Sequence, residues 1–212
     1  MAKRIGVICV VLGVVCILSA IGFLVYNRWE DKYAEEVSQE LLADVQSMIE
    51  ERQTARPFPD DPVTQPDHPV IPEAEKPAKE MAAVQVDGHD CIGILSIPAL
   101  DLELPVLTDW SYAKLKKAPC HYYGSYYEKD FVIAAHNYKS HFGRLADLQA
   151  GDVVFFTDVT GVVHTYEVIL LETLPKEATY EMIAGGFALS LYTCTPGGAS
   201  RVTVRCNTVE NS

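Results

Sequence analysis

Basic residues are scarce in this 212-residue chain. Lys and Arg together number 17 against 29 Asp and Glu, which gives a formal net charge of -12 at pH 7. The first 26 residues hold two of these cations and no acid, so the remainder is more acidic than the whole. Such a surface repels a phosphate backbone, which excludes nucleic acid as a partner and disfavours electrostatic docking on anionic lipid.

Several motifs of cofactor and metal chemistry are also absent. The chain has no phosphate-binding glycine loop, no His-Glu-x-x-His, no internal repeat and no Cys-x-x-Cys among its six cysteines. Cys91, Cys120, Cys194 and Cys206 are scattered without the spacing of zinc ligands. We therefore expect free thiols and neither a metal nor another cofactor.

Charge is missing from one long run, Ile5 to Tyr26, which follows Lys3 and Arg4. As a helix these 22 residues would cross a hydrocarbon core at about 1.5 Å per residue. The pattern predicts a single-pass anchor in residues 1–28, with a cytoplasmic tip and the bulk of the chain outside the cell membrane. The alternative is a cleaved signal peptide, for which Ser19-Ala20 offers only a poor cleavage site.

Two segments of different composition follow the apolar run. Residues 29–56 hold neither Gly nor Pro before Pro57, and their apolar residues recur near helical spacing, which predicts a helical stalk. Residues 57–81 contain seven prolines among acidic residues. This composition predicts a semi-rigid linker that sets how far the following domain extends from the anchor.

From residue 82 to 212 short apolar runs alternate with turns, which predicts one mostly-β domain. The expected strands are Ile92–Ile97, Glu103–Leu107, Asp130–Ala135, Val153–Thr157, Val162–Leu171 and two around Cys194. The expected short helices are Trp110–Lys117, Phe142–Leu148 and Thr179–Ile183.

The last two expected strands form a hairpin with potentially catalytic residues beside its turn. Cys194 closes the first strand, Thr195–Ser200 has the composition of a turn, and Arg201 opens the second strand. In a symmetric turn Cys194 lies opposite Arg201. The cysteine then has two interpretations: a buried, inert thiol, or a nucleophile that needs a nearby base and a donor for a developing oxyanion.

The register of this hairpin ranks the neighbouring residues. Arg205 shares the face of Arg201 but lies roughly 13 Å further along the strand, so Arg201 is the preferred donor. Cys206 points to the opposite face, which argues against a disulfide with Cys194.

A histidine that could serve as the base follows a buried-looking strand, Phe131–Ala135. His136 at this strand end is suited to hold a rigid catalytic imidazole, although structural histidines occur at the same kind of position. His121 and His141 are further candidates. His164 lies in an alternating strand, and we expect it to face solvent.

Taken in order, these pieces resemble the sortases, the cysteine transpeptidases of Gram-positive surfaces. The resemblance covers Ile92 to Cys206, and its specific part is Thr-Cys194 with the downstream Arg201 and the distant His136-Asn. Further matching pieces are Ile94-Leu-Ser-Ile-Pro98, His121-Tyr-Tyr-Gly-Ser, Phe142-Gly-x-Leu145, Gly151-Asp152 and Tyr166-x-Val168.

The resemblance implies a closed sortase-type β-barrel with short helices, in which His136, Cys194 and Arg201 are catalytic. It also implies a membrane-anchored extracellular enzyme that cleaves a sorting signal through a thioester and transfers the acyl group to an amine. The acceptor would belong to a cell-wall precursor or to another protein. Two alternatives stay open: a cysteine protease with the same site, and a non-catalytic membrane-tethered binding module.

The sortase class is left open by conflicting motifs. The Asn after His136 and the following Phe-Gly-x-Leu resemble the class B branch, whereas Cys194-Thr-Pro-Gly resembles the pilin-assembling branch. Asp61-Pro62 is followed by Val63 instead of the aromatic residue of a pilin-type lid. These features favour protein anchoring or a specialised substrate.

Overall fold

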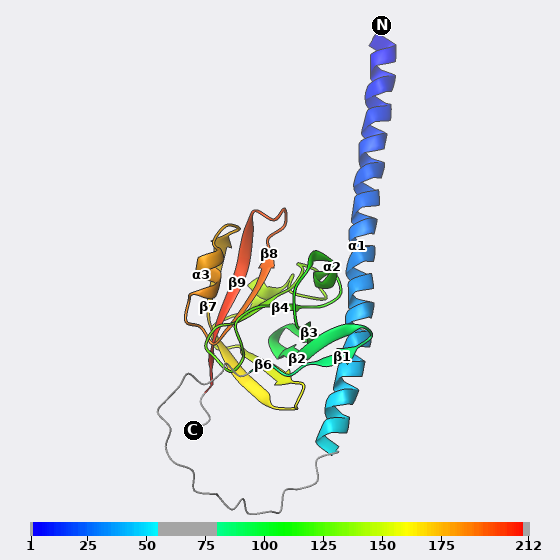
Figure 1. Cartoon of the computed structure of the whole chain (residues 1–212). Coiled ribbons are helices and arrows are strands. Elements are labelled where there is room, and N and C mark those ends of the chain that lie inside the picture. Colours follow the sequence, from blue (N-terminus) through cyan, green and yellow to red (C-terminus); the bar gives the residue numbers. More distant parts are fainter. Residues whose placement is uncertain (1, 55–79, 210–212) are drawn as a thin grey trace, which may run out of the picture.

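The computed structural model of the chain describes residues 2–54 and 80–209, with side chains described from residue 10 onward. The predicted linker over 57–81 falls almost wholly outside the described residues. Figure 1 shows two bodies side by side: one long helix and a barrel of strands.

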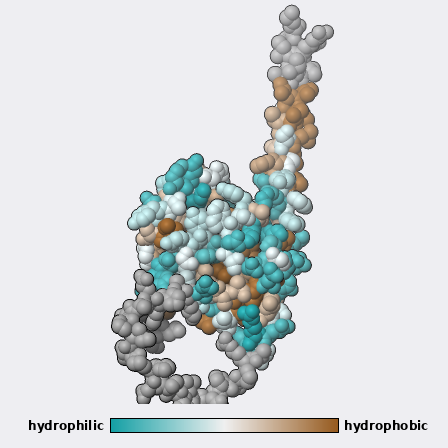
Figure 2. Space-filling view, viewed as in Figure 1, coloured by the Kyte–Doolittle hydropathy of each residue, from teal (hydrophilic) through white to brown (hydrophobic). Residues whose placement is uncertain are grey.

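Helix α1 (Ala2–Thr54) joins the predicted anchor and the predicted stalk without a break. No Gly or Pro interrupts its second half, which allows the helix to continue. Among the described residues, α1 is the one helix long and apolar enough to cross a membrane. Its apolar part stands clear of the barrel, as the brown surface in Figure 2 shows.

The strands of the barrel are β1 (Val84–Val86), β2 (His89–Ile97), β3 (Leu102–Leu107), β4 (Cys120–Tyr123), β5 (Phe131–Ala134), β6 (Val153–Asp158), β7 (Val163–Pro175), β8 (Leu189–Cys194) and β9 (Ser200–Thr208). The strand order is β1-β2-β3-β4-β5-β8-β9-β7-β6, and an antiparallel pairing of β2 with β6 closes the sheet. Strand β1 is a hairpin extension outside the closed ring. The prediction of a mostly-β closed barrel is confirmed.

Short helices fill the connections between strands. They are η1 (Pro98–Leu100), α2 (Tyr112–Leu115), η2 (Leu145–Asp147) and α3 (Thr179–Ile183). Helix α3 has the predicted bounds, whereas α2 and η2 are shorter than the helices predicted around them.

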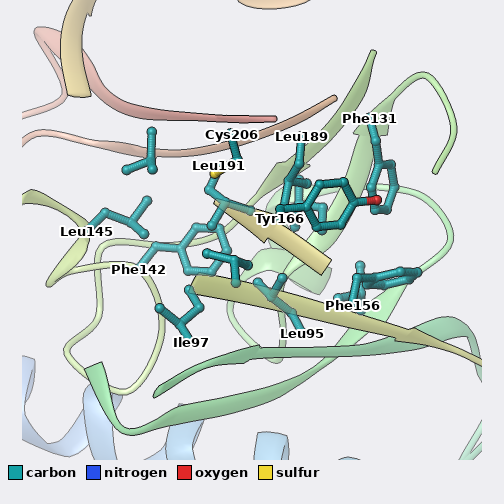
Figure 3. Packing of buried hydrophobic residues seen from close by; sticks show 14 of the residues in the cluster. Leu95, Ile97, Phe131, Phe142, Leu145, Phe156, Tyr166, Leu189, Leu191 and Cys206 are labelled. Carbon is teal, nitrogen blue, oxygen red and sulfur yellow. The ribbon is translucent and has the colours of Figure 1, made fainter. Parts of the chain in front are cut away.

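The barrel interior holds the main core. Alternating residues of the strands point inward, among them Leu95, Phe131, Phe156, Tyr166 and Leu191, all of them almost fully buried. Figure 3 shows these side chains interlocking between the strands. Each such side chain contributes roughly 1.5–3 kcal/mol by leaving water.

A second core lies between the barrel and α1. Leu41, Val45 and Ile49 of the helix pack on a patch that includes Cys91 and Cys120 of the barrel. The part of α1 predicted as a stalk is therefore a packed element of the fold, and its apolar stripe has a partner.

Candidate functional site

The β8–β9 hairpin has the predicted geometry. Cys194 pairs with Arg201 across the hairpin, and Leu189 pairs with Cys206 at its other end. Cys194 is exposed, whereas Cys206 is fully buried in the barrel core. The two thiols lie on opposite faces of the sheet and do not form a disulfide.

The turn between the strands is built from residues that tolerate left-handed backbone. Gly197 and Gly198 have φ values of 83° and 74°, which other residues rarely adopt. The Thr195 amide donates to the Ser200 carbonyl oxygen at 3.0 Å and closes the turn. Pro-Gly-Gly thus gives a tight reversal that keeps Cys194 and Arg201 opposite one another.

His136 reaches Cys194 through a parallel strand pair. Strands β5 and β8 are parallel, with Ala134 opposite Tyr192. The Ala135 amide donates to the Tyr192 carbonyl oxygen, and Thr193 Oγ1 donates to the Ala135 carbonyl oxygen at 2.9 Å. The pairing therefore continues past the end of β5 to Ala135, which brings His136 to the same edge of the sheet as Cys194.

The ring of His136 packs against a tyrosine two residues later in the sequence. Tyr138 stacks on it, with ring centroids 4.1 Å apart and planes inclined by 11°. Burial lowers the pKa of His136, an effect that Asn137 and the Glu30 carboxylate of α1 oppose. The imidazole is therefore neutral at pH 7 and able to accept a proton. Sequence patterns did not single out Tyr138.

The loop that carries His136 depends on a glycine. A Cβ at Gly143 would lie 2.6 Å from the Asn137 carbonyl oxygen and 2.7 Å from that of Tyr138. The Gly143 amide donates to the Tyr138 carbonyl oxygen at 2.8 Å. This close approach gives the Phe142-Gly motif a structural reason.

The two arginines of β9 have different surroundings. Arg201 is half-buried, and its Nη1 donates to carbonyl oxygens of the turn, Gly198 and Ser200. Arg205 is almost fully buried, and it donates to Glu172 at 2.8 Å, to Ser190 Oγ and to the carbonyl oxygens of Glu181 and Met182 in α3. Arg205 is thus committed to holding the β7–β8 connection, and Arg201 is the arginine beside Cys194.

The three other histidines singled out in the barrel sequence have structural surroundings. The ring nitrogens of His121 contact the carbonyl oxygens of Thr108 and Gly124, and His141 is fully buried. Burial lowers the pKa of His141 to about 4. The prediction that His164 faces solvent is wrong: its side chain is 19% exposed because it packs beside Asp158, at 3.4 Å, and Tyr126.

A cavity of about 150 Å³ opens beside the cysteine and arginine. Its lining includes Cys194 and Arg201, four aromatic residues and the β7–β8 connection. The aromatic residues are Trp110, Tyr112, Tyr122 and Tyr192, and Tyr122 meets Tyr192 edge-on, with ring centroids 5.2 Å apart. Such a wall suits an extended peptide with apolar side chains. Within the residues described, no group of three or more His, Cys, Asp or Glu side chains could hold a metal.

Solved structures with the same fold are sortases. Sortase C1 from Streptococcus agalactiae matches with a TM-score of 0.52 and 26% identity, over 60% of this chain and 72% of that one. Sortase C1 of pilus island 1 of group B Streptococcus gives 0.51 and 19%, over 57% and 66%. Sortase A from Corynebacterium diphtheriae, a lid mutant, gives 0.50 and 23%, over 58% and 73%.

Comparison with curated protein sequences finds no match. A family model, by contrast, matches residues 95–209, more than half of the chain, and its description is "Sortase domain". These residues include the barrel from within β2 to the end of β9, with the hairpin and the His136 loop. By fold and by sequence pattern, the chain belongs to the sortase family.

Proposed function

We propose that the protein is a membrane-anchored extracellular cysteine transpeptidase with Cys194 as nucleophile, His136 as acid and base, and Arg201 as oxyanion donor. The observation that supports this most directly is the backbone arrangement. Cys194 is paired with Arg201 on β9, and Ala134, two residues before His136, is paired with Tyr192, two residues before Cys194. The proposed nucleophile at the end of β8, the proposed base two residues after β5 and the proposed cation near the start of β9 lie at one edge of the barrel.

The first half-reaction cleaves a sorting signal. His136 takes the proton of the Cys194 thiol, and the sulfur attacks a backbone carbonyl carbon. Arg201 stabilises the oxyanion, the C–N bond breaks, and His136 gives its proton to the departing amine. The product is a thioester on Cys194.

The second half-reaction joins the acyl group to an acceptor. An amine attacks the thioester carbon and passes a proton to His136 while the C–S bond breaks. The thiolate then recovers the proton from His136. A positioned amine competes well with water, so an ordered acceptor gives transfer instead of hydrolysis.

The proposed organisation follows the sequence. Residues 1–28 form a cytoplasmic tip and anchor, 29–56 a helical stalk, 57–81 a linker and 82–212 the catalytic domain outside the cell membrane. The uncharged run and the single candidate span among the described residues support the anchor. The acceptor is an amine of a cell-wall precursor or of a protein, and the signal is a peptide of the Leu-Pro-x-Thr-Gly or Asn-Pro type.

A peptide library tests this function. The full chain in detergent is incubated with the library and triglycine, and the products are weighed by mass spectrometry. We expect a subset of peptides to be cleaved and joined to triglycine, and Cys194→Ala to abolish both products. Full transfer by Cys194→Ala would refute the proposal, and cleavage without any triglycine product would favour the protease alternative.

A further inference from the structure

The loop that carries His136 (residues 136–144) is bonded to itself. The Phe142 amide donates to the His136 carbonyl oxygen at 3.2 Å. The Gly143 amide donates to the Tyr138 carbonyl oxygen at 2.8 Å, and the Tyr138 ring stacks on the imidazole with centroids 4.1 Å apart. The turn and the two rings therefore form one unit, and a shift of the turn moves the ring that packs on His136.

Strand pairing does not extend as far as the His136 side chain. Among the described hydrogen bonds, the last ones to β8 before it are those of Ala135 with Tyr192 and Thr193. Within the described residues, Nδ1 of His136 is buried without a hydrogen bond of ordinary geometry. The plane of the imidazole therefore depends on packing, and so on the place of the loop that supplies Tyr138.

Helix α1 holds this loop from outside the barrel through Asp31. Asp31 Oδ1 accepts hydrogen bonds from the Ser140 amide at 3.3 Å and from Ser140 Oγ at 3.0 Å, and the hydroxyl also lies 3.3 Å from the Asp31 carbonyl oxygen. Bonds to a carboxylate are roughly twice as strong as bonds between neutral groups. The two residues are 109 positions apart in sequence, so the contact forms only when the helix packs on the barrel.

The position of Asp31 is set by the packing of α1. One face of the helix has residues at three- and four-residue spacing, which are Asp31, Ala34, Ser38, Leu41 and Val45. All of them except Asp31 are almost fully buried, and Asp31 is partly buried. A carboxylate on such a face loses water and needs hydrogen-bond donors, of which Ser140 supplies two. The packed helix therefore presents a fixed acceptor to the loop.

We infer that Asp31 is a positioning residue for His136. Through Ser140 it fixes the turn that carries Tyr138, and the Tyr138 ring sets the plane of the imidazole. Helix α1, which runs alongside the barrel in Figure 1, is thereby a part of the catalytic apparatus. The inference rests on the proposed function. A displacement of about 1 Å at a reacting group lowers a rate about 100-fold, so one contact at the loop has a large effect on the reaction.

Asp31 acts by contact and not by its charge. Burial lowers the pKa of His136, and the charges that act on this pKa are those of Glu30, which raises it, and Lys116, which lowers it. The variant Asp31→Asn keeps a side-chain oxygen that accepts both bonds from Ser140 and loses the charge. This exchange therefore separates positioning from electrostatics.

Single-turnover thioester formation tests the positioning role. The full chain in detergent is mixed with a peptide identified from the library, and the maximal rate constant and the peptide concentration at half-maximal rate are measured. In Asp31→Ala we expect the rate constant to fall at least tenfold and the half-maximal concentration to stay within twofold, because the cavity beside Cys194 shares no lining residue with the loop. In Asp31→Asn we expect a rate constant within threefold of the wild type and the same dependence on pH.

The matched control is Asp44→Ala, which removes the same side chain from an exposed position of α1. Its rate constant is expected to stay within twofold of the wild type. A wild-type rate in Asp31→Ala, or an Asp31→Asn variant as slow as Asp31→Ala, would overturn the inference and leave the proposed function intact. A wild-type chain that cleaves no peptide of the library would instead refute the proposed function.

Thiol protection separates a moved loop from a detached helix. Cys91 and Cys120 are buried in the contact between α1 and the barrel. In Asp31→Ala we expect both thiols to stay as unreactive towards iodoacetamide as in the wild type, because Leu41 and Val45 still pack on the barrel. Labelling of either thiol would show that Asp31 holds the helix as a whole, and it would overturn the positioning role.

A double-mutant cycle tests the route through Tyr138. Tyr138→Phe keeps the stacked ring, and its rate constant is expected to stay within threefold of the wild type, whereas Tyr138→Ala is expected to be at least tenfold slower. Because Asp31 acts through this ring, the double variant Asp31→Ala/Tyr138→Ala is expected to be no more than about twofold slower than the slower single variant. Effects that multiply would overturn the route from Asp31 to His136.

Discussion

Cys194 differs from the other barrel thiols in its access to solvent. Burial raises the pKa of Cys91 to about 11 and those of Cys120 and Cys206 to about 12, and all three side chains are buried. A buried thiol of this kind is inert because the thiolate is the reactive form. Within the described barrel, exposure therefore separates the proposed nucleophile from the structural cysteines.

Alkylation checks this difference. The two cysteines of the apolar run are first removed by Cys9→Ser and Cys16→Ser. In this variant, iodoacetamide at pH 7.5 is expected to modify Cys194 and to leave Cys91, Cys120 and Cys206 unmodified over the same time. Peptide mass spectrometry identifies the modified residue. Equal labelling of Cys206 would contradict the burial on which the assignment depends.

The two arginines of β9 predict opposite mutant phenotypes. Arg201→Met removes an oxyanion donor, and we expect thioester formation to slow by about 10²- to 10³-fold with little change in stability. Arg205→Met leaves Glu172 and Ser190 without their buried partner, at a cost of about 3 kcal/mol in the free energy of unfolding. Single-turnover kinetics and urea unfolding measure the two effects, and a reversed pattern would contradict the assignment.

His141 predicts a pH dependence of stability. Its folded-state pKa, about 4, lies below the ordinary value of 6.5, because burial disfavours the charged ring and neighbouring His136 adds to this, while Asp31 opposes it. Below pH 6.5 the unfolded chain binds a proton that the folded chain refuses, so stability falls as the pH drops from 6.5 to 4. For this one group the loss between pH 7.5 and 5 is about 2 kcal/mol.

The variant His141→Leu removes this titration. Urea unfolding in detergent at both pH values is expected to show a loss about 2 kcal/mol smaller than in the wild type. The same loss in both proteins would show that His141 does not titrate as its burial implies.

Among the elements, α1 has the least expected role. The apolar spacing of Val37, Leu41, Val45 and Met48 predicts a helix, but the sequence does not indicate what the apolar stripe packs against. Its partner is a patch of the barrel built from β1 to β4, which assembles only when the barrel closes. Helical spacing of apolar residues identifies the face of the helix that is buried, whereas the partner of that face depends on the tertiary structure.

A charge in this contact tests the packing. Val45 is fully buried, so Val45→Asp places a carboxylate in an apolar interface and is expected to detach α1 from the barrel. Cys91 and Cys120 under the helix then become reactive towards iodoacetamide, while Cys206 inside the barrel stays protected. Protection of all three thiols in Val45→Asp would contradict the packed arrangement.

The strands also divide into those that the sequence predicts and those that it does not. Apolar patterns in the sequence predict seven strands. These are β2, β3, β5, β6, β7 and β8, and also β9 after its glycine turn. Strands β1 and β4 were missed because they are three and four residues long, and β4 is joined to β3 by a single parallel pair. β5 is also only four residues long, but all of its residues are apolar, whereas β4 has the mixed sequence Cys-His-Tyr-Tyr.

The site itself was partly predictable. Cys194 and Arg201 are joined by a short turn, so their pairing follows from local sequence. The neighbouring position of His136 depends on the parallel pairing of β5 with β8, two strands separated by more than fifty residues. The family resemblance suggested this partner, whereas periodicity and turn composition did not.

On the scale of the whole molecule, one apolar helix and one closed barrel form a single unit. The packed half of α1 fixes the helix on the barrel, and the His136 loop lies near the end of the uncharged run, where Ser140 bonds Asp31 and Leu24 lines the same cavity as His136. If α1 crosses the membrane as proposed, the proposed reaction takes place near the membrane surface.

The central claim is that Cys194 carries the acyl group between donor and acceptor. Intact-mass spectrometry of the full chain, quenched with acid after mixing with a cleavable peptide, tests it most directly. We predict an adduct of the mass of the acyl fragment on Cys194 that disappears when triglycine is added and does not form in Cys194→Ala. Transfer product without any such adduct, or an adduct on another residue, would contradict the proposed mechanism.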